Sequence, residues 1–276
     1  MAAVITLTTD FGTRDPYVAE MKAVILRLHP GVRFVDVTHE VAAHDVVEGG
    51  LAVEAIAAVC PPGTIHVAVV DPGVGTSRRG LVVAAGGQLF VGPDNGIFSA
   101  ALSLADWQAF ELLAAAYRRA TVSATFHGRD VFGPAAAHLA RGVAPSGFGP
   151  PVARPVRLVW GESREVGGGV EGQVIHVDRF GNLITSIDAG AVERLGRTGG
   201  VARVRIARRE MPLVRTYGDL AANKAGALVG SRGRLEVVVR EGSAAALLRA
   251  GRGARVRLSQ STKASKASKA SERGRS

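Results

Sequence analysis

The chain has 276 residues, of which 47% are hydrophobic and 21% are charged, and its formal net charge is +10. This length and composition predict one large domain or two smaller ones with a substantial core. The single cysteine, Cys60, excludes an internal disulfide and a cysteine-rich metal site, and the sequence has no run of about 18 apolar residues that could cross a membrane. The first five residues lack a basic segment and lead directly into a strand pattern, so we expect no secretory signal and a cytoplasmic protein.

Strand and helix patterns alternate along the first half of the chain. Residues 4–8 form the first predicted strand, and Asp15 before Pro16 predicts an N-cap with proline at the first helical position. The helix that follows would bury a face on which apolar residues are spaced by three, four and seven positions. Residues 33–37 form the next predicted strand.

A second helix is expected after Asp45, which forms a capping-box pattern with Glu48. The predicted buried stripe of this helix consists of Val47, Leu51, Ala55 and Val59. Further strands are predicted at residues 65–70, 81–85 and 89–92, and a further helix at residues 131–140. Strands that alternate with helices in this way predict an α/β domain with a largely parallel sheet.

Two of the predicted strands lead into an aspartate that is followed by glycine. The apolar run at residues 65–70 ends at Asp71-Pro72-Gly73-Val74-Gly75, and the first strand ends at Asp10-Phe11-Gly12. A continuous apolar run is typical of a strand that is covered on both faces, as in parallel sheets. Because ligands of open α/β sheets bind beyond the carboxyl ends of such strands, we expect Asp10 and Asp71 to share one site.

The second half of the chain has a different pattern. A cluster of Pro and Gly at residues 143–155 indicates a linker. Short β-rich runs follow at residues 156–160, 173–178, 201–206 and 234–239. They predict a small antiparallel barrel or sandwich. The expected organisation is an α/β catalytic domain at residues 1–145, a β-barrel-like domain at residues 155–258 and a basic tail at residues 259–276.

The predicted tail is a low-complexity segment of Ser, Ala and Lys. It has three Lys and two Arg against one Glu, and so contributes +4 of the net charge of +10. Such a segment has almost nothing to bury, so we expect it to be disordered. A solvated tail without a partner is the favoured interpretation, and loose contact with nucleic acid or an anionic surface is the alternative.

Taken singly, the candidate functional residues have ordinary structural explanations. Asp10 fits a turn as well as a site, and His39, His44 and His66 fit hydrogen-bonded positions. His127 differs because it lies in Thr125-Phe126-His127-Gly128-Arg129-Asp130, where glycine and a helix start gather polar groups around it.

The sequence has no nucleotide-binding motif and no serine-hydrolase motif. The glycines after Asp71 lack the dinucleotide spacing, and neither a Walker sequence nor Gly-x-Ser-x-Gly occurs. A two-metal hydrolase is an alternative, with Asp10, Asp71, Asp94 and His127 as an oxygen-rich ligand set that suits magnesium or manganese. No His-x-His or His-x-x-x-His spacing supports it.

Seven short motifs occur in one order along the chain, and their combination is more specific than any one of them. They are Thr9-Asp10-Phe11-Gly12, Asp36-Val37-Thr38-His39, Val70-Asp71-Pro72-Gly73-Val74-Gly75 with Arg78, Pro93-Asp94-Asn95-Gly96, Thr125-Phe126-His127-Gly128-Arg129-Asp130, Asp178-Arg179-Phe180-Gly181-Asn182 and Ser231-Arg232-Gly233. With these motifs the sequence resembles the S-adenosylmethionine (SAM) hydroxide adenosyltransferases, which are relatives of the fluorinating and chlorinating adenosyl enzymes. The resemblance runs from residue 5 to residue 258 and omits only the tail.

The resemblance implies a fold, an assembly and a reaction. Members of the family join an α/β domain to a β-barrel-like domain, form homotrimers, and bind SAM where domains of neighbouring subunits meet. The implied reaction is hydrolysis of SAM to adenosine and L-methionine by attack of activated water at C5′, with no cofactor and no metal.

The resemblance also assigns roles to residues. Asp71, Arg78 and His127 match the water-activating set of the family. Asp71 and His127 would orient the water and accept its proton, and Arg78 would stabilise the developing hydroxide. The implied substrate-binding residues are Asp10 at the ribose, Phe180 and Asn182 around adenine, Asp178 and Ser231 at the methionine portion, and Asn95.

Three positions distinguish this chain within the resemblance. Halogenating members have tyrosine and serine near the positions of Asp71 and Gly128, so halide use is not expected. Spacing favours Arg78 over Arg79 as the inward-facing arginine. His44 stands where halogenating members have a tryptophan against the ribose.

Three alternatives to a SAM hydrolase remain open. A metal-dependent phosphate-ester hydrolase would lose activity with a chelator, and a non-catalytic adenosine or SAM sensor would release no methionine. A nucleic-acid-binding protein would depend on residues 259–276. We expect neither a membrane partner nor a specific nucleic acid.

Overall fold

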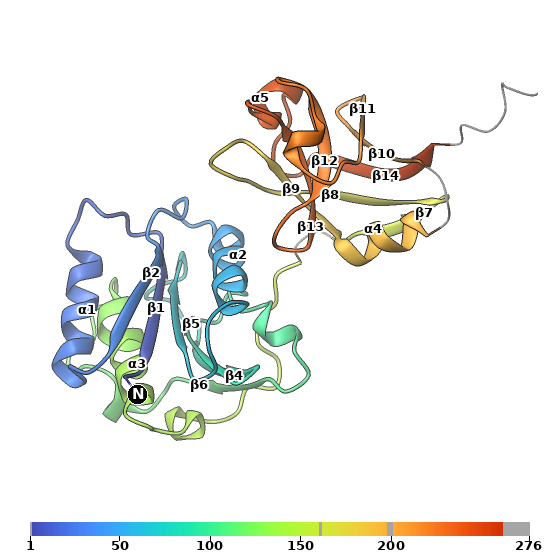
Figure 1. The fold of residues 1–276 in the computed structure, drawn as a ribbon. Helices are drawn as coiled ribbons and strands as arrows, with labels where there is room; N and C mark the ends of the chain where they lie inside the picture. Colours follow the sequence, from blue (N-terminus) through green and yellow to red (C-terminus); the bar gives the residue numbers. More distant parts are fainter. Residues whose placement is uncertain (1, 160–161, 198–200, 262–276) are drawn as a thin grey trace, which may run out of the picture. The chain divides into compact units, whose positions relative to one another are not determined.

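The computed structural model describes residues 2–159, 162–197 and 201–261. The chain divides into two compact units, Met1–Leu158 and Val159–Ser276, and each is described by itself (Figure 1). None of the helices in the described ranges is long and apolar enough to cross a membrane.

The N-terminal unit contains a six-stranded sheet with the order β2-β1-β3-β5-β4-β6. β1 is parallel to β2 and β3, and β3 is parallel to β5, whereas β4 is antiparallel to both of its neighbours, β5 and β6. The prediction of an α/β unit with a largely parallel sheet is therefore confirmed. The strands are β1 (Val4–Thr9), β2 (Arg33–Thr38), β3 (Ile65–Val69), β4 (Gly80–Ala85), β5 (Gln88–Pro93) and β6 (Gln108–Glu111).

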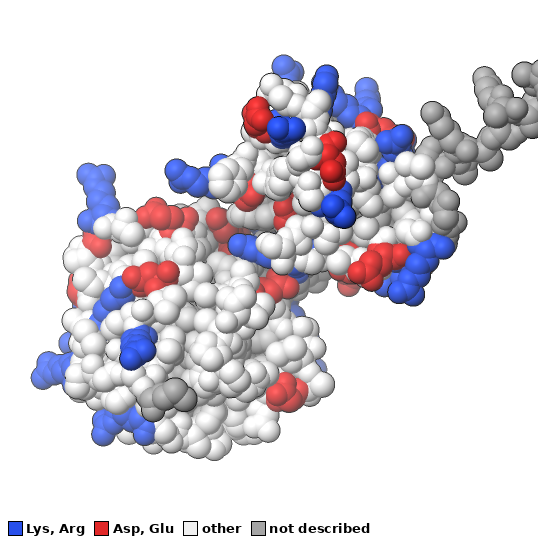
Figure 2. Space-filling model, in the orientation of Figure 1, with Lys and Arg blue, Asp and Glu red and all other residues white. Residues whose placement is uncertain are grey.

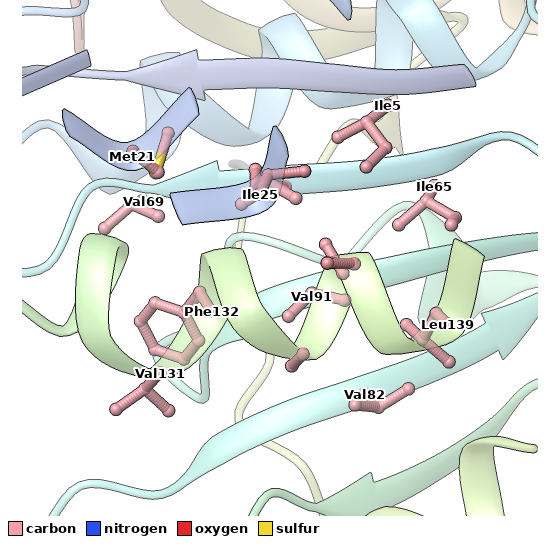
Figure 3. Close-up of a cluster of buried hydrophobic side chains, with 14 of the residues drawn as sticks. Ile5, Met21, Ile25, Ile65, Val69, Val82, Val91, Val131, Phe132 and Leu139 are labelled. Carbon is pink, nitrogen blue, oxygen red and sulfur yellow. The ribbon is translucent and has the colours of Figure 1, made fainter. Parts of the chain in front are cut away.

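Helices cover both faces of this sheet (Figure 1). At the end of β3, Val69 belongs to the apolar cluster formed with α1 (Tyr17–Leu28) and α3 (Gly133–Ala140), as Figure 3 shows. The next residue, Val70, belongs to a second cluster that includes α2 (Val46–Ala57). Because successive residues pack against different helix layers, β3 is apolar at every position except His66, whose buried ring is hydrogen-bonded to Thr6 and Gln88.

The helix starts differ in part from the predicted caps. Pro16 rather than Asp15 is the N-cap residue of α1. Asp45 caps α2 as predicted, and its Oδ1 accepts the backbone N–H of Glu48 at 3.0 Å. The Glu48 carboxylate accepts the N–H of Ala42 instead of that of Asp45, so only half of the expected capping box forms.

The predicted buried stripe of α2 is correct in part: Leu51 is buried and Val47 and Ala55 are half-buried, but Val59 lies beyond the end of the helix. Val59 is 76% exposed, whereas Gly49, Gly50 and Val53 are buried. A Cβ at Gly49 would lie only 2.9 Å from the side chain of Val70. The helix therefore contacts the sheet closely through its glycines, and a hydrophobic pattern that ignores glycine misses this face.

The C-terminal unit is an antiparallel, nearly closed barrel-like sheet with the order β11-β10-β14-β8-β9-β13-β12. A bridge between Leu213, after β11, and Ala227 of β12 brings the two edge strands together. This confirms the predicted barrel-like unit. The strands are β7 (Arg164–Val166), which pairs with β8, β8 (Gly169–Val177), β9 (Leu183–Asp188), β10 (Val201–Ile206), β11 (Arg209–Pro212), β12 (Ala225–Val229), β13 (Arg234–Val239) and β14 (Arg255–Ser261).

Two short helices, α4 (Ala189–Gly196) and α5 (Ala244–Leu248), accompany the barrel-like sheet. The barrel core is formed by the inward-facing side chains of its strands. They include Val174, Leu183, Val204, Val237 and Leu258.

The structure differs from the prediction at residues 156–159 and at the start of the predicted tail. The chain at 156–159 forms no strand, because the N–H of Val156 donates to Asp94 at 2.7 Å and that of Leu158 to Ser99. β14 extends to residue 261, three residues into the predicted tail. The remainder of that expected tail, residues 262–276, lies outside the described residues, as does residue 160.

Candidate active site

The carboxyl ends of β1, β3 and β5 lie at one edge of the N-terminal sheet, and an aspartate follows each strand. Asp10 follows β1, Asp71 follows β3 after one residue, and Asp94 follows β5 directly. Thr9 is paired with Val69 in the sheet, so Asp10 and Asp71 leave neighbouring strands close to the same level. This edge is where open α/β sheets bind their ligands.

Asp71, Arg78 and His127 form one hydrogen-bonded set. The Nε of Arg78 lies 2.9 Å from Oδ1 and 3.1 Å from Oδ2 of Asp71, and Nη2 also donates to Oδ2. The same Nη2 lies 2.7 Å from Nδ1 of His127. The side chains of Asp71 and Arg78 are only 5% and 12% exposed, so solvent screens this ion pair weakly. The structure thus brings together the three residues that were predicted to activate water.

The contact with Arg78 determines the protonation state of His127. Because a guanidinium only donates, Nδ1 of His127 must present a lone pair, and the neutral imidazole carries its proton on Nε2. Burial lowers the pKa of His127, and the charge of Arg78 lowers it further, against the opposing effects of Asp71 and Asp130. His127 is therefore held neutral, with a hydrogen-bond donor at Nε2.

A glycine turn brings Arg78 next to the segment that carries His127. Gly75 has a φ of +77°, and a Cβ at this position would lie 2.5 Å from the carbonyl oxygen of Ala124. Only glycine tolerates both the left-handed backbone and this close approach. The hydroxyl of Thr76 closes the turn by donating to the carbonyl of Gly73 at 2.7 Å.

A buried carboxylate fixes the loop before His127. The π-helical segment η3 (Gly128–Phe132) begins directly after His127 and contains the fully buried Asp130. Asp130 accepts hydrogen bonds from two arginine side chains and, at 2.9 Å, from the N–H of Ser123. Burial raises the pKa of Asp130, but the bonds from Arg129, Ser123 and the second arginine outweigh this and bring it to about 2. The carboxylate thus stays charged and ties the loop to the helix.

The adjacent arginine, Arg79, has other partners. Its Nε donates to Oδ2 of Asp94 at 2.8 Å and its Nη2 to the carbonyl of Arg154 at 3.1 Å. Arg78 is therefore the arginine at Asp71, in agreement with the choice made from spacing.

Within the described residues, no three or more His, Cys, Asp or Glu side chains are arranged to hold a metal ion. Asp94, one of the four metal ligands considered from sequence, is engaged by Arg79 instead.

Asp10 is held by its neighbours on both sides. Its Oδ2 accepts the backbone N–H of His44 at 2.9 Å. The preceding residue, Thr9, contacts Nδ1 of His39 at 2.9 Å, and Nε2 of that histidine lies 3.1 Å from Asp36. No described residue donates to Oδ1 of Asp10, which remains an acceptor for a ligand hydroxyl. His44 thus contributes its backbone rather than its ring, which belongs to an exposed residue.

Asn95 supports the strand end that carries Asp71. Its Nδ2 donates to the carbonyl of Val70 at 2.8 Å, and its Oδ1 accepts the N–H of Ile97 at 3.2 Å. Both ends of the amide are thus bound to backbone. Contact of Asn95 with a substrate stays a prediction.

The four site residues predicted in the C-terminal unit line one hollow of about 450 Å³. They are Asp178, Phe180, Asn182 and Ser231. Oδ1 of Asp178 accepts the backbone N–H groups of Phe180 and Asn182, and its Oδ2 accepts Nδ2 of Asn182 at 2.9 Å. This turn presents the Phe180 ring, which is 76% exposed, to the solvent.

Two further residues of this hollow were not predicted from the sequence. The hydroxyl of Tyr217 lies 3.2 Å from Nδ2 of Asn182. Glu236 of β13 also lines the hollow, and burial raises its pKa, with a further rise from the negative charge of Asp178 and an opposing effect of Arg232. Leu235 and Val237 are core residues, so strand alternation places Glu236 on the outer face. That alternation was visible in the sequence, but the hollow was not.

The fold and the site define a two-unit protein with an Asp–Arg–His set at the edge of an α/β sheet and a barrel-like sheet after it. A crystal structure of an uncharacterized conserved protein from Thermotoga maritima has this fold, with a TM-score of 0.86 and 32% identity over 93% of this chain and 100% of that one. Residues 5–149 match the model of the SAM hydroxide adenosyltransferase N-terminal domain, and residues 172–257 that of the C-terminal domain. The chain belongs to the SAM hydroxide adenosyltransferase family.

Curated relatives have two kinds of name. The (R)-S-adenosyl-L-methionine hydrolase of Thermus thermophilus is 42% identical over 258 residues, which cover 91% of this chain and 97% of the relative. A fluorinase of an Actinoplanes strain is more distant, with 27% identity over 78% of this chain and 83% of that enzyme.

Proposed function

We propose that this protein hydrolyses SAM to adenosine and L-methionine by attack of a water-derived oxygen on C5′. The observation that carries the proposal is the hydrogen-bonded set of Asp71, Arg78 and His127 at the carboxyl edge of the sheet. The names of the hydrolase relatives support SAM, in its (R) form, as the substrate.

The chemical difficulty lies in the nucleophile and not in the leaving group. The sulfonium of SAM leaves as a neutral thioether and needs no protonation. Water has a pKa near 15.7, so the site must favour hydroxide where it is needed. Arg78 keeps its positive charge and stabilises the developing hydroxide. In-line positioning of water and C5′ can contribute roughly 7–11 kcal/mol in the best intramolecular models.

The tautomer of His127 gives His127 and Asp71 different roles in the proposed reaction. Since Nδ1 is occupied by Arg78, His127 donates from Nε2 to the attacking oxygen and holds it in place. Asp71 then accepts the proton of the water, because Oδ1 has only one bond, from Nε of Arg78, and keeps a lone pair. This refines the sequence-based expectation, in which both Asp71 and His127 accepted the proton.

The remaining site residues bind the substrate in this proposal. The open Oδ1 of Asp10 accepts a ribose hydroxyl. Asn182 donates from Nδ2 to Asp178 and Tyr217, which leaves its Oδ1 to accept from the adenine amino group. Phe180 offers a ring face to adenine or to the sulfonium. The methionine ammonium is assigned to Asp178 and to Ser231, and Asn95 is kept as a residue that supports the site.

The assembly follows from the resemblance and the location from the composition. We propose a homotrimer, and the single cysteine favours a cytoplasmic location. Light scattering coupled to gel filtration tests the trimer, because it measures the mass of the assembly, which should be three times the chain mass of 28.6 kDa. A monomeric mass would contradict it.

A time course with purified protein and SAM tests the reaction itself. Methionine and adenosine should appear in equal amounts, repeatedly per protein molecule, and equally fast with EDTA. A single stoichiometric binding event without product would indicate a sensor, and loss of activity with EDTA would favour a metal-dependent hydrolase. Chloride in place of other salts should yield no 5′-chloro-5′-deoxyadenosine, since halide use is not expected with Asp71 and Gly128 present.

A further inference from the structure

The positive charge of the protein lies in its second half. Residues 1–158 contain twelve Lys and Arg against thirteen Asp and Glu, whereas residues 159–276 contain twenty-two against eleven. Such an asymmetry between halves of a chain is typical of proteins that contact polyanions. Neither the proposed reaction nor its site uses this excess.

Part of the excess gathers on the outer face of β10 and β14. Arg205, Arg208, Arg255 and Arg257 line one hollow of about 380 Å³ there, and together we call them the arginine face. Figure 2 shows blue side chains over the region where Figure 1 labels β10, β11 and β14. The residues that alternate with them, including Val204 and Val256, are buried in the barrel core. The arginines therefore point outward.

Two features make this face unfavourable in the isolated protein. Arg205 and Arg257 are directly opposite each other on antiparallel strands, an arrangement in which like charges repel. The two-residue turn between β10 and β11 consists of Ala207 and Arg208, with φ of +48° and +64°. Such turns favour Asn and Gly, so an arginine is held here in a strained conformation at the edge of the hollow.

Acidic partners do not balance this charge. Glu171 is the acidic residue of the hollow, and it is shared between Arg257, at 3.0 Å, and Arg164, at 3.3 Å. Glu210 lies opposite Arg205 on β11, but its ion pair is with Arg203, at 3.9 Å. Among the residues that the structure describes, no carboxylate forms an ion pair with Arg205, Arg208 or Arg255. These three guanidinium groups are exposed and available to an external anion.

We propose that the arginine face binds the phosphate backbone of nucleic acid without sequence preference. The guanidinium fork matches phosphate geometry. Side chains two residues apart on a strand, such as Arg255 and Arg257, are roughly 7 Å apart and can contact successive phosphates. None of the described residues that line the hollow is aromatic, so bases have no ring on which to stack and only the backbone is contacted. Beyond β14 the sequence continues with five Lys and Arg against one Glu, which extends the same charge.

The test measures binding of the full chain to a fluorescent 20-base-pair duplex of mixed sequence, by anisotropy at several salt concentrations. The double variant Arg205→Gln/Arg255→Gln should bind at least 10-fold more weakly at low salt. Its plot of log affinity against log salt should be shallower by about 2, as expected for two lost phosphate contacts. The matched control Arg14→Gln/Arg27→Gln removes the same charge from exposed positions of the N-terminal unit and should bind within about twofold of the wild type.

Three results would overturn the proposal. The first is equal weakening in both double variants, which would indicate a net-charge effect. The second is unchanged binding in the face variant together with complete loss on deletion of residues 262–276. The third is binding to vesicles with anionic lipid but not to DNA. Thermal melting of each variant establishes that it is folded. Failure of the proposed function would show separately, as absence of SAM hydrolysis by the wild type.

Discussion

The two units of this protein hold their polar residues in different ways. In the N-terminal unit, Asp71 and Arg78 are almost fully buried and bonded to each other, and His127 completes the set. In the C-terminal unit, Phe180 and Ser231 are exposed around an open hollow. Buried, mutually bonded groups keep one geometry at all times, which a reacting water molecule requires. Exposed groups around a hollow suit binding and release of a ligand.

The comparison predicts which changes affect turnover and which affect affinity. Substitutions in the N-terminal set should lower kcat, and substitutions around the C-terminal hollow should raise the dissociation constant of the substrate.

The largest effect is expected for Asp71→Asn. The amide keeps the shape of the side chain but cannot accept the proton of the water, so kcat should fall by roughly 10²–10⁴-fold, with SAM affinity within about threefold of wild type. Steady-state kinetics and equilibrium binding measure the two quantities. Asp94→Asn is the matched control, since it removes the partner of Arg79 and should leave kcat largely unchanged. Equal losses of kcat and affinity in Asp71→Asn would assign that residue to binding.

The second effect is a dependence on pH. Protonation of His127 turns Nδ1 into a donor that faces another donor on Arg78, and burial holds the pKa of His127 below its usual 6.5. Activity should therefore be full at neutral pH and fall as the pH drops through a value below 6.5, about tenfold per unit beyond it. A rate profile from pH 4.5 to pH 8 shows this limb. The variant His127→Asn should have lower activity and no such limb. A limb that persists in the variant would assign the titration to another group.

A smaller effect is expected for Asp10→Asn. Loss of a charged hydrogen bond to a ribose hydroxyl is worth about 1.5–3 kcal/mol, so adenosine should bind roughly 10- to 100-fold more weakly. Calorimetric titration with adenosine measures this directly, and 5′-deoxyadenosine is a useful second ligand because it keeps the same hydroxyls. Unchanged affinity for both would remove the ribose role from Asp10.

The smallest effect is expected for Glu236→Gln. Glu236 lines the same hollow as Asp178, to which the methionine ammonium is assigned, so its negative charge should also attract that ammonium. SAM and methionine carry the ammonium and adenosine does not, so only the first two should bind more weakly, by about 3- to 10-fold. Burial raises the pKa of Glu236 above its usual 4.5, so the wild type should lose this advantage as the pH falls toward that raised value. Titrations with all three ligands at two pH values measure the difference. An equal change for adenosine would indicate a general distortion of the hollow.

Much of the fold was predictable from local patterns. The apolar run of β3 and the aspartate that follows it indicated a covered strand and a ligand edge, and both are present. β10 and β13 were predicted with their observed bounds, because both are rich in β-branched residues. β6, β7, β9, β11, β12 and β14 were missed, since most of these strands are short, with no distinct period of their own, and are defined by their neighbours in the sheet.

The site was predictable only through motifs in combination. His127 by itself had no stronger claim than other histidines, and its contact with Arg78 depends on the left-handed backbone of Gly75 and on the buried Asp130. These are long-range features that spacing cannot specify. Glu236 and Tyr217 belong to no motif and became candidates only when the barrel-like sheet placed them around the same hollow.

Hydrolysis in ¹⁸O-labelled water tests the central claim most directly, when the products of wild type and Asp71→Asn are compared by mass spectrometry. We predict one ¹⁸O atom in the 5′-hydroxyl of adenosine, none in methionine, and a much slower appearance of the same labelled adenosine with the variant. Unlabelled adenosine, or labelled adenosine formed equally fast by both proteins, would contradict the account in which Asp71, Arg78 and His127 activate water.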